Sequence, residues 1–155
     1  MKAKKTYRAK VISMTQGVGW SPINGYHGYY EVHRSGRVRS KIRTIFYKQC
    51  NRRLRGKILS PQLNSKGYER VQLCKSGVRD QRFVHRLVAK TFIPNPGLKK
   101  QVNHKNGKKR DNRVVNLEWV TGKENILHAY KTGLIRPRVV KMPAKVFKLP
   151  SRKVA

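Results

Sequence analysis

The chain has 155 residues, which allows one compact domain or two small modules with tails and excludes a large multidomain enzyme. It carries 38 Lys and Arg against 6 Asp and Glu, a formal net charge of +32 at pH 7, and 37% hydrophobic residues. A surface of ordinary mixed charge is excluded, and self-repulsion of this size calls for a polyanion, so we expect nucleic acid as the partner.

The chain carries no mark of secretion or of membrane insertion. Cys50 and Cys74 form no C-x-x-C pair, which favours free thiols in an intracellular compartment. No apolar run approaches the length of a membrane span. The acid-free start, residues 1–19, fits either a basic arm on nucleic acid or a mitochondrial transit peptide, and we favour the arm. We therefore expect a soluble intracellular protein.

The first half of the chain predicts two β-hairpins. Residues 29–40 alternate around the turn Ser35-Gly36, and residues 68–84 alternate around Ser76-Gly77. We expect these hairpins to form one small antiparallel sheet. The basic stretch between them, residues 41–60, is interpreted as a loop.

The second half predicts the order helix, strand, strand, helix. Residues 85–92 have apolar positions at helical spacing and end before Pro94. Two strands, 101–104 and 117–120, follow, with a turn at Asn106-Gly107. Thr121 and Glu124 fit a capping box that starts the last helix, and Gly133 is a suitable stop. Residues 134–155 have seven Lys and Arg, three Pro and no acid, which is typical of a tail.

This order would bring several polar side chains together. His104, at the end of the first strand, would face Asn125 and His128, which share one helix face at i and i+3. Asn116 precedes the second strand, where its amide could fix the loop that carries His104. Hydrolysis of a phosphodiester needs a base and a cation, and this group could supply both. Alternatively, the His is an ordinary surface residue and the asparagines form turns.

Residues 103–128 resemble the HNH motif of the ββα-metal nucleases, in the form found in phage and intron-encoded homing endonucleases. Residues 84–89 and 92–96 resemble the segment that leads into this motif. The N-terminal half is similar to a nuclease-associated module that often precedes it. That similarity rests on Trp20-Ser21-Pro22-Ile23, Gly25-Tyr26, Gly28, Tyr30-Glu31-Val32 and Ser35-Gly36-Arg37-Val38-Arg39-Ser40. Together the resemblance covers about residues 20–133.

The resemblance implies an α+β fold, with a small N-terminal antiparallel β-hairpin module, a ββα-metal (HNH) domain and extended basic tails. The expected division is a basic arm at 1–19, the β-hairpin module at 20–83, the HNH domain at 84–133 and a basic, Pro-containing tail at 134–155. It also implies a cytoplasmic location in a bacterium or a phage-infected cell or, alternatively, in a mitochondrion or another organelle.

The resemblance also implies roles for individual residues. His104 would be the general base and Asn116 the residue that orients it. Asn103 and Asn125 would be metal ligands, with His128 as an additional candidate, and the ion would be Mg²⁺ or another divalent cation. Position 103 is Asp in some relatives, and amide and imidazole ligands bind a hard cation weakly. Substrate phosphate could complete the site, or the site could be silent.

Two functions remain open. The leading hypothesis is a homing-type DNA endonuclease. The alternative is a non-catalytic, HNH-derived RNA-binding protein, for instance a component of a ribosome, with a mitochondrial ribosome as one option, whose basic tails lie among rRNA helices within a large ribonucleoprotein. In either case, ten cations around the hairpins and the His104 loop are expected to contact nucleic acid. These are Arg34, Arg37, Arg39, Lys41, Arg43, Arg86, Lys105, Lys108, Lys109 and Arg110.

Overall fold

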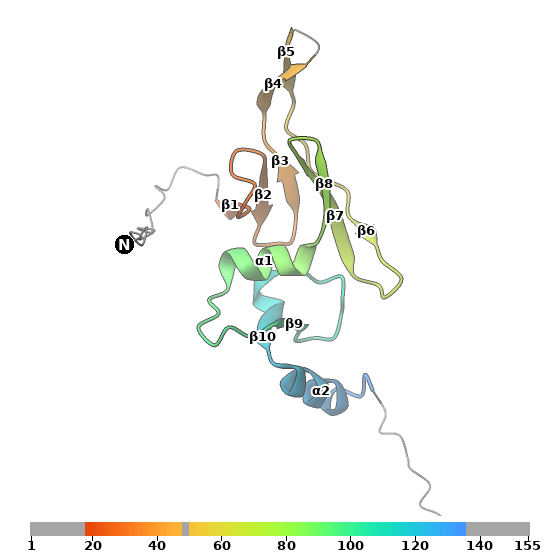
Figure 1. The fold of residues 1–155 in the computed structure, drawn as a ribbon. Coiled ribbons are helices and arrows are strands. Elements are labelled where there is room, and N and C mark those ends of the chain that lie inside the picture. Colours follow the sequence, from red (N-terminus) through yellow and green to blue (C-terminus); the bar gives the residue numbers. More distant parts are fainter. Residues whose placement is uncertain (1–17, 48–49, 136–155) are drawn as a thin grey trace, which may run out of the picture.

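The computed structural model of the chain describes residues 18–47 and 50–135, and it has the mixed α+β class that the sequence predicts. Strands dominate the first half, and two helices flank a strand pair in the second (Figure 1). The predicted basic arm and tail lie outside the described residues, apart from 18–19 and 134–135. The predicted division into domains remains a prediction.

Both hairpins predicted in the first half are confirmed, and each gains a short third strand. The first sheet runs in the order β1 (Trp20–Pro22), β2 (Tyr30–His33), β3 (Val38–Ser40). The second runs in the order β6 (Gln62–Leu63), β7 (Glu69–Lys75), β8 (Val78–Phe83). Gly36 and Gly77 have φ of +89° and +79°, which suits glycine at these turns. β1 and β6 are too short to show an alternating pattern.

Two expectations for the first half are wrong. Residues 41–60 are not a loop, because β4 (Arg43–Tyr47) and β5 (Cys50–Leu54) form a hairpin that projects from the rest of the protein (Figure 1). The β-branched and aromatic residues of β4 favour strand despite the basic composition, and β5 forms by pairing with β4. The described strands of this half also form three sheets rather than one. Arg39, in β3, makes only an isolated β-bridge with Ile58, which lies outside the named strands.

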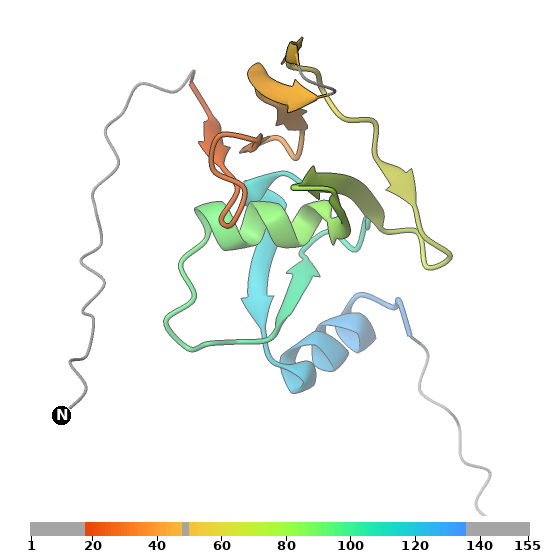
Figure 2. The same cartoon turned by 45° about the horizontal axis from the view of Figure 1, so that its top comes forward.

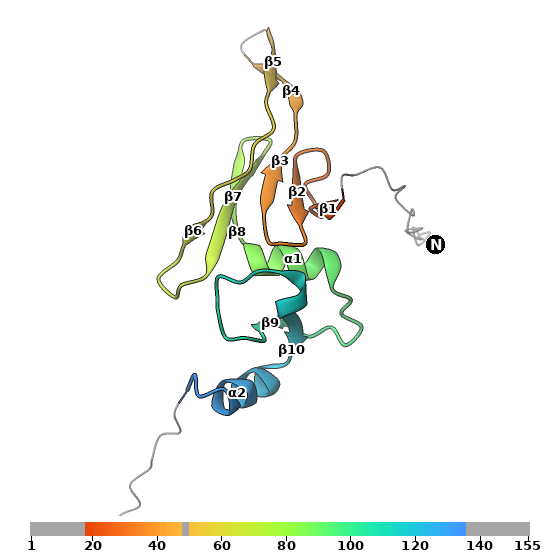
Figure 3. The same cartoon turned by 180° about the vertical axis from the view of Figure 1, so that it is seen from behind.

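Helix α1 (Val84–Phe92) lies between the N-terminal sheets and the strand pair of the second half (Figure 1 and Figure 3). It buries Val84, Leu87 and Val88, spaced i, i+3 and i+4, as the sequence predicts. One core is therefore shared by both halves of the chain. Its buried members are Ile23, Tyr30, Val32, Val38, Val71, Leu73, Val84, Leu87, Val88 and Leu117.

The strand, strand, helix order of the second half is also confirmed. β9 (Gln101–His104) pairs antiparallel with β10 (Leu117–Val120), and the short 3-10 turn η1 (Val114–Asn116) leads into β10. α2 (Gly122–Lys131) follows on the far side of the pair from α1 (Figure 2).

Helix α2 begins with the predicted capping box between Thr121 and Glu124, and Gly133 at φ +70° follows its C-terminal end. It buries none of its own residues, so local capping matters more to it than core packing does. Within the described ranges, neither helix is long and apolar enough to cross a membrane.

Candidate functional site

Four of the five predicted site residues line one cleft of about 320 Å³. Asn103 and His104 come from the end of β9, whereas Asn125 and His128 come from the facing side of α2. His104 is 4% exposed. The strand pair and the capped helix thus bring together the polar side chains that the sequence pattern placed on them.

The imidazole of His104 is held by Asn112, a residue that the sequence analysis missed. His104 Nε2 lies 3.3 Å from Asn112 Oδ1, while Asn112 Nδ2 donates to Glu69 Oε2 at 2.7 Å. Burial lowers the pKa of His104 below its ordinary value, and the bond to Asn112 offsets this only in part. The imidazole is therefore neutral at neutral pH and able to accept a proton.

Asn116 does not line the cleft, and it contacts the loop rather than the imidazole. Its Oδ1 accepts from the Asn106 backbone at 3.0 Å, and its Nδ2 donates to the Asp111 carbonyl at 2.8 Å. Its own carbonyl accepts from the Lys105 backbone at 2.9 Å. The amide therefore ties together the loop that follows His104, and any influence on the imidazole passes through the backbone.

The candidate metal ligands are neutral oxygen and nitrogen donors. Asn103 Nδ2 donates to Glu118 Oε1 at 2.9 Å, and Asn125 Nδ2 donates to Gln101 Oε1 at 2.9 Å, so both amide oxygens remain available. His128 Nε2 lies 3.0 Å from the Lys105 carbonyl, so Nδ1 is the ring nitrogen of His128 that could bind an ion.

Amide and imidazole donors without a carboxylate hold a hard divalent cation only weakly, and substrate phosphate would have to complete its coordination. Within the described residues, no group of three or more His, Cys, Asp or Glu side chains is placed to hold a metal ion. The residues therefore fit an ion that depends on substrate for part of its coordination.

A cluster of rings packs against His104. His85, at the start of α1, lies with its ring centroid 5.2 Å from that of His104, and the Tyr68 centroid lies 6.0 Å away. His85 is 7% exposed, and its Nδ1 has no hydrogen-bond partner in the part of the chain that the structure describes. Burial lowers the pKa of His85 to about 4, so this side chain is a neutral packing residue.

The cations predicted to contact nucleic acid fall into two groups. Lys109 lines the cleft, and Lys105, Lys108 and Arg110 are exposed on the loop after His104. The remaining six belong to the hairpins and α1, and most contact other parts of the protein. Arg39 stacks on Trp20, Arg37 lies near the same ring, Arg34 lies over Phe92, Arg43 lies over Tyr29, and Arg86 donates to the Lys100 carbonyl.

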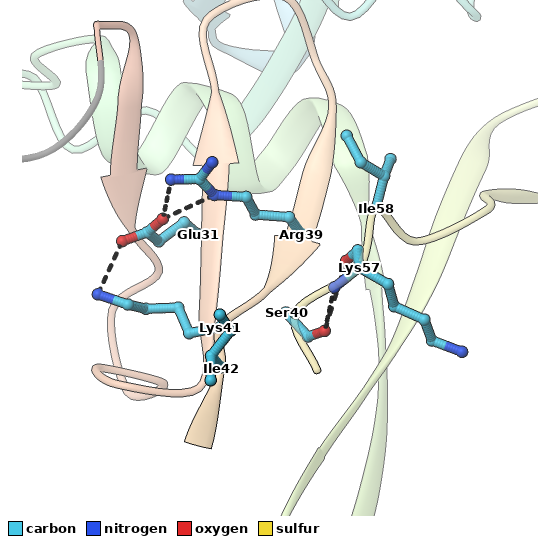
Figure 4. Close-up of a pocket in the computed structure, with 8 residues that line it drawn as sticks. Glu31, Arg39, Ser40, Lys41, Ile42, Lys57 and Ile58 are labelled. Atoms are coloured by element: carbon cyan, nitrogen blue, oxygen red, sulfur yellow. Dashed lines mark hydrogen bonds and ion pairs between the residues drawn. The ribbon is translucent and has the colours of Figure 1, made fainter. Parts of the chain in front are cut away.

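Arg39 and Lys41 are engaged with a buried carboxylate. Glu31, 2% exposed, accepts from Arg39 at 2.7 Å and lies 3.1 Å from Lys41 Nζ (Figure 4). Burial alone would raise the pKa of Glu31, but its bonds to Arg39 and Lys41 outweigh burial and lower it. The adjoining cleft, about 500 Å³, has its only carboxylate neutralised and contains no histidine among its lining residues, so it offers no general base.

Comparison with known proteins matches two segments of the chain. Residues 19–74 match the model of the NUMOD4 motif, and residues 82–127 match the HNH endonuclease model. The chain belongs to the HNH endonuclease family. The HNH match spans β9, β10 and most of α2, the elements that carry the cleft, and HNH nucleases generally depend on a divalent metal ion.

Three relatives illustrate the family relationship. DNA endonuclease I-HmuI of Bacillus phage SP01 is 35% identical over 127 residues, covering 82% of this chain and 66% of the relative. HNH endonuclease L247 of Acanthamoeba polyphaga mimivirus is 52% identical over 82 residues, 51% of this chain and 20% of the relative. The prophage-derived putative HNH homing endonuclease YosQ of Bacillus subtilis is 49% identical over 70 residues, 44% and 40% of the two chains.

The fold also matches a solved structure of this HNH family. The structure, titled for DNA binding and cleavage by the HNH homing endonuclease I-HmuI, aligns with a TM-score of 0.59 at 35% identity and covers 76% of this chain and 60% of that one. This chain thus spans between 20% and 66% of the length of the curated relatives named or matched. None of these matches supports the ribosomal alternative.

Proposed function

We propose that this protein binds DNA and hydrolyses its phosphodiester bonds with the help of a divalent metal ion, as a homing-type HNH endonuclease. The observation that carries the proposal is a neutral, buried His104 beside the amide groups of Asn103 and Asn125 in one cleft. One relative, the DNA endonuclease I-HmuI, binds and cleaves DNA, and this supports DNA rather than RNA as the ligand.

In the proposed reaction, His104 removes a proton from the attacking water. The accepting atom is Nδ1, because Nε2 is engaged with Asn112. Asn116 keeps the loop after His104 in place, and the amide oxygens of Asn103 and Asn125, with His128 as a further candidate, would hold Mg²⁺ or another divalent ion. Such an ion would neutralise charge that develops on the phosphate and the leaving oxygen.

The cationic loop beside the cleft would position the DNA backbone. Lys105, Lys108, Lys109 and Arg110 follow His104 directly, so a phosphate that reaches the imidazole also comes within reach of these side chains. The projecting β4–β5 hairpin has the two-stranded form that the major groove admits. These contacts supply affinity and register, while His104 supplies the chemistry.

The proposal is tested by incubating the protein with supercoiled plasmid and Mg²⁺ or Mn²⁺. The wild type should nick the plasmid, and His104→Ala should lose nicking while it still binds DNA in a gel-shift assay. His27→Ala changes an exposed histidine outside the cleft and should nick at the wild-type rate. Equal nicking by the wild type and His104→Ala, or no nicking with either ion, would contradict the proposal.

A further inference from the structure

The hydrogen bonds around Asn112 have only one chemically consistent direction. Its Nδ2 lies 2.7 Å from Glu69 Oε2 and 3.4 Å from the Arg110 carbonyl. A carboxylate and a carbonyl can only accept, so the NH₂ group of Asn112 must face them. Its Oδ1 is therefore the atom that faces His104.

The orientation of Asn112 decides which nitrogen of His104 bears the proton. Asn112 Oδ1 can only accept, so His104 Nε2, 3.3 Å away, must donate. In a neutral imidazole the other nitrogen then holds the lone pair. That nitrogen, Nδ1, takes no hydrogen bond from the described residues and is free to act as the base.

Glu69 lies at the position from which the direction of these hydrogen bonds can be set. It lies in β7, 43 residues before Asn112 along the chain, and its other oxygen is 3.6 Å from Arg110 Nε. A carboxylate is a stronger hydrogen-bond acceptor than a neutral group, and the Arg110 guanidinium lies beside the second oxygen of Glu69. The carboxylate of Glu69 thus sets the direction of both hydrogen bonds, the one to Asn112 and the one between Asn112 and His104.

The turn between β2 and β3 also packs closely against Asn112. A Cβ added at Gly36, in the β2–β3 turn, would lie 2.8 Å from the Asn112 Cβ, so only glycine allows this approach. The Arg34 carbonyl accepts from the Val114 backbone at 3.0 Å, which attaches the same turn to the loop. Asn112 is 3% exposed as a result and has little freedom to rotate.

We infer that Glu69, acting through Asn112, holds His104 in the tautomer with its proton on Nε2, so that the N-terminal module supplies a positioning residue to the cleavage site. The catalytic meaning of this tautomer rests on the proposed nuclease function, but the tautomer itself does not. Glu69 and Asn112 touch neither substrate nor ion in this scheme, and their effect is exerted on the base.

The tautomer can be measured directly by two-bond ¹H–¹⁵N NMR of the histidine rings in the full chain, at a pH where His104 is neutral. The wild type should show a protonated Nε2 and an unprotonated Nδ1. Glu69→Gln should give a mixture of tautomers, because Gln can either donate or accept and Asn112 can then turn over. Asp80→Asn removes the same charge from β8 outside this chain of bonds and should leave the wild-type signals.

A double variant separates bond direction from simple loss of structure. When Glu69→Gln is combined with Asn112→Asp, the new carboxylate at position 112 can only accept. The new amide at position 69 then donates to it, and His104 Nε2 donates as before. This variant should return the single tautomer that Glu69→Gln loses. If Glu69→Gln fails to fold, the wild type and the double variant still test the inference.

The inference is overturned if wild-type His104 carries its proton on Nδ1, if Glu69→Gln leaves the tautomer unchanged, or if the double variant does not restore it. Nicking is followed in parallel, and Glu69→Gln should slow it by about 10-fold or more. If the tautomers behave as expected and the wild type does not nick, the nuclease proposal fails and the positioning role of Glu69 stands.

Discussion

The carboxylate of Glu118 accepts a hydrogen bond of 2.9 Å from the side-chain amide of Asn103, directly across the β9–β10 ladder. Because the carboxylate can only accept, it fixes the Asn103 amide with its oxygen turned away from Glu118. The negative charge also polarises the amide, which makes its oxygen a better ligand for a cation than a free amide would be.

We expect Glu118→Gln to weaken metal binding by about 10-fold, because Gln no longer dictates which way the Asn103 amide points. Mn²⁺ affinity would be measured by electron paramagnetic resonance in the presence of a DNA oligonucleotide. Asp80→Asn has the same change in charge outside the cleft and should bind Mn²⁺ like the wild type. An unchanged affinity in Glu118→Gln would show that Glu118 does not orient Asn103.

Stability should depend on pH through His85. Its pKa is about 4 in the folded protein and about 6.5 when unfolded, so below pH 6.5 the unfolded state binds more protons. The free energy of unfolding should therefore fall as the pH drops from 6.5 to 4, by on the order of 3 kcal/mol from this residue. Urea denaturation at several pH values measures the fall.

His85→Leu removes this titrating group and should reduce the pH dependence, whatever its effect on stability at pH 7. The part due to His104, whose pKa burial also lowers, should remain. His27→Gln removes an exposed histidine and should retain the wild-type slope. A His85→Leu variant that loses as much stability between pH 6.5 and 4 as the wild type would contradict the assignment.

The N-terminal cap should decide how firmly α2 holds its two site residues. Thr121→Ala removes the hydroxyl that accepts from the Glu124 backbone, and should cost about 1 kcal/mol. Because α2 buries none of its residues, the loss should appear as faster amide exchange within α2. Thr121→Ser keeps the hydroxyl and should behave as the wild type. Unchanged exchange in Thr121→Ala would mean that other contacts hold the helix.

Two lysines should differ in their effect on DNA binding. The Lys108 side chain makes no ion pair or hydrogen bond with the described residues, whereas Lys41 is engaged with the buried Glu31. Lys108→Gln should reduce the slope of log K against log salt by about 0.9, the effect of one phosphate contact. Lys41→Gln should change the slope less and lower the stability of the fold instead. Equal slopes for wild type and Lys108→Gln would remove Lys108 from the interface.

Local sequence signals predicted the elements that local physics determines. The glycine turns at Gly36 and Gly77, the apolar spacing in α1 and the Thr121 capping box each lie within a few residues, and the structure contains all of them. The β4–β5 hairpin was missed because the β-branched and aromatic residues lie in β4 alone, whereas β5 has two Arg, one Asn and no residue that favours strand.

The contacts that complete the site could not be predicted in this way. Asn112 is one of several asparagines in a loop, and nothing in its neighbourhood distinguishes it from a turn residue. Glu69 is 43 residues away and belongs to a different hairpin. Their relation to His104 depends on how two sheets pack around α1, which a pattern of nearby residues does not encode.

The apolar side of α1 is covered both by strands that precede it and by strands that follow it. Neither the NUMOD4 segment nor the HNH segment therefore contains the whole hydrophobic core. A fragment that begins at Val84 would leave Leu87 and Val88 facing water where β2 and β7 had covered them. The two matched segments should therefore unfold together, in a single cooperative transition, because each completes the interior of the other.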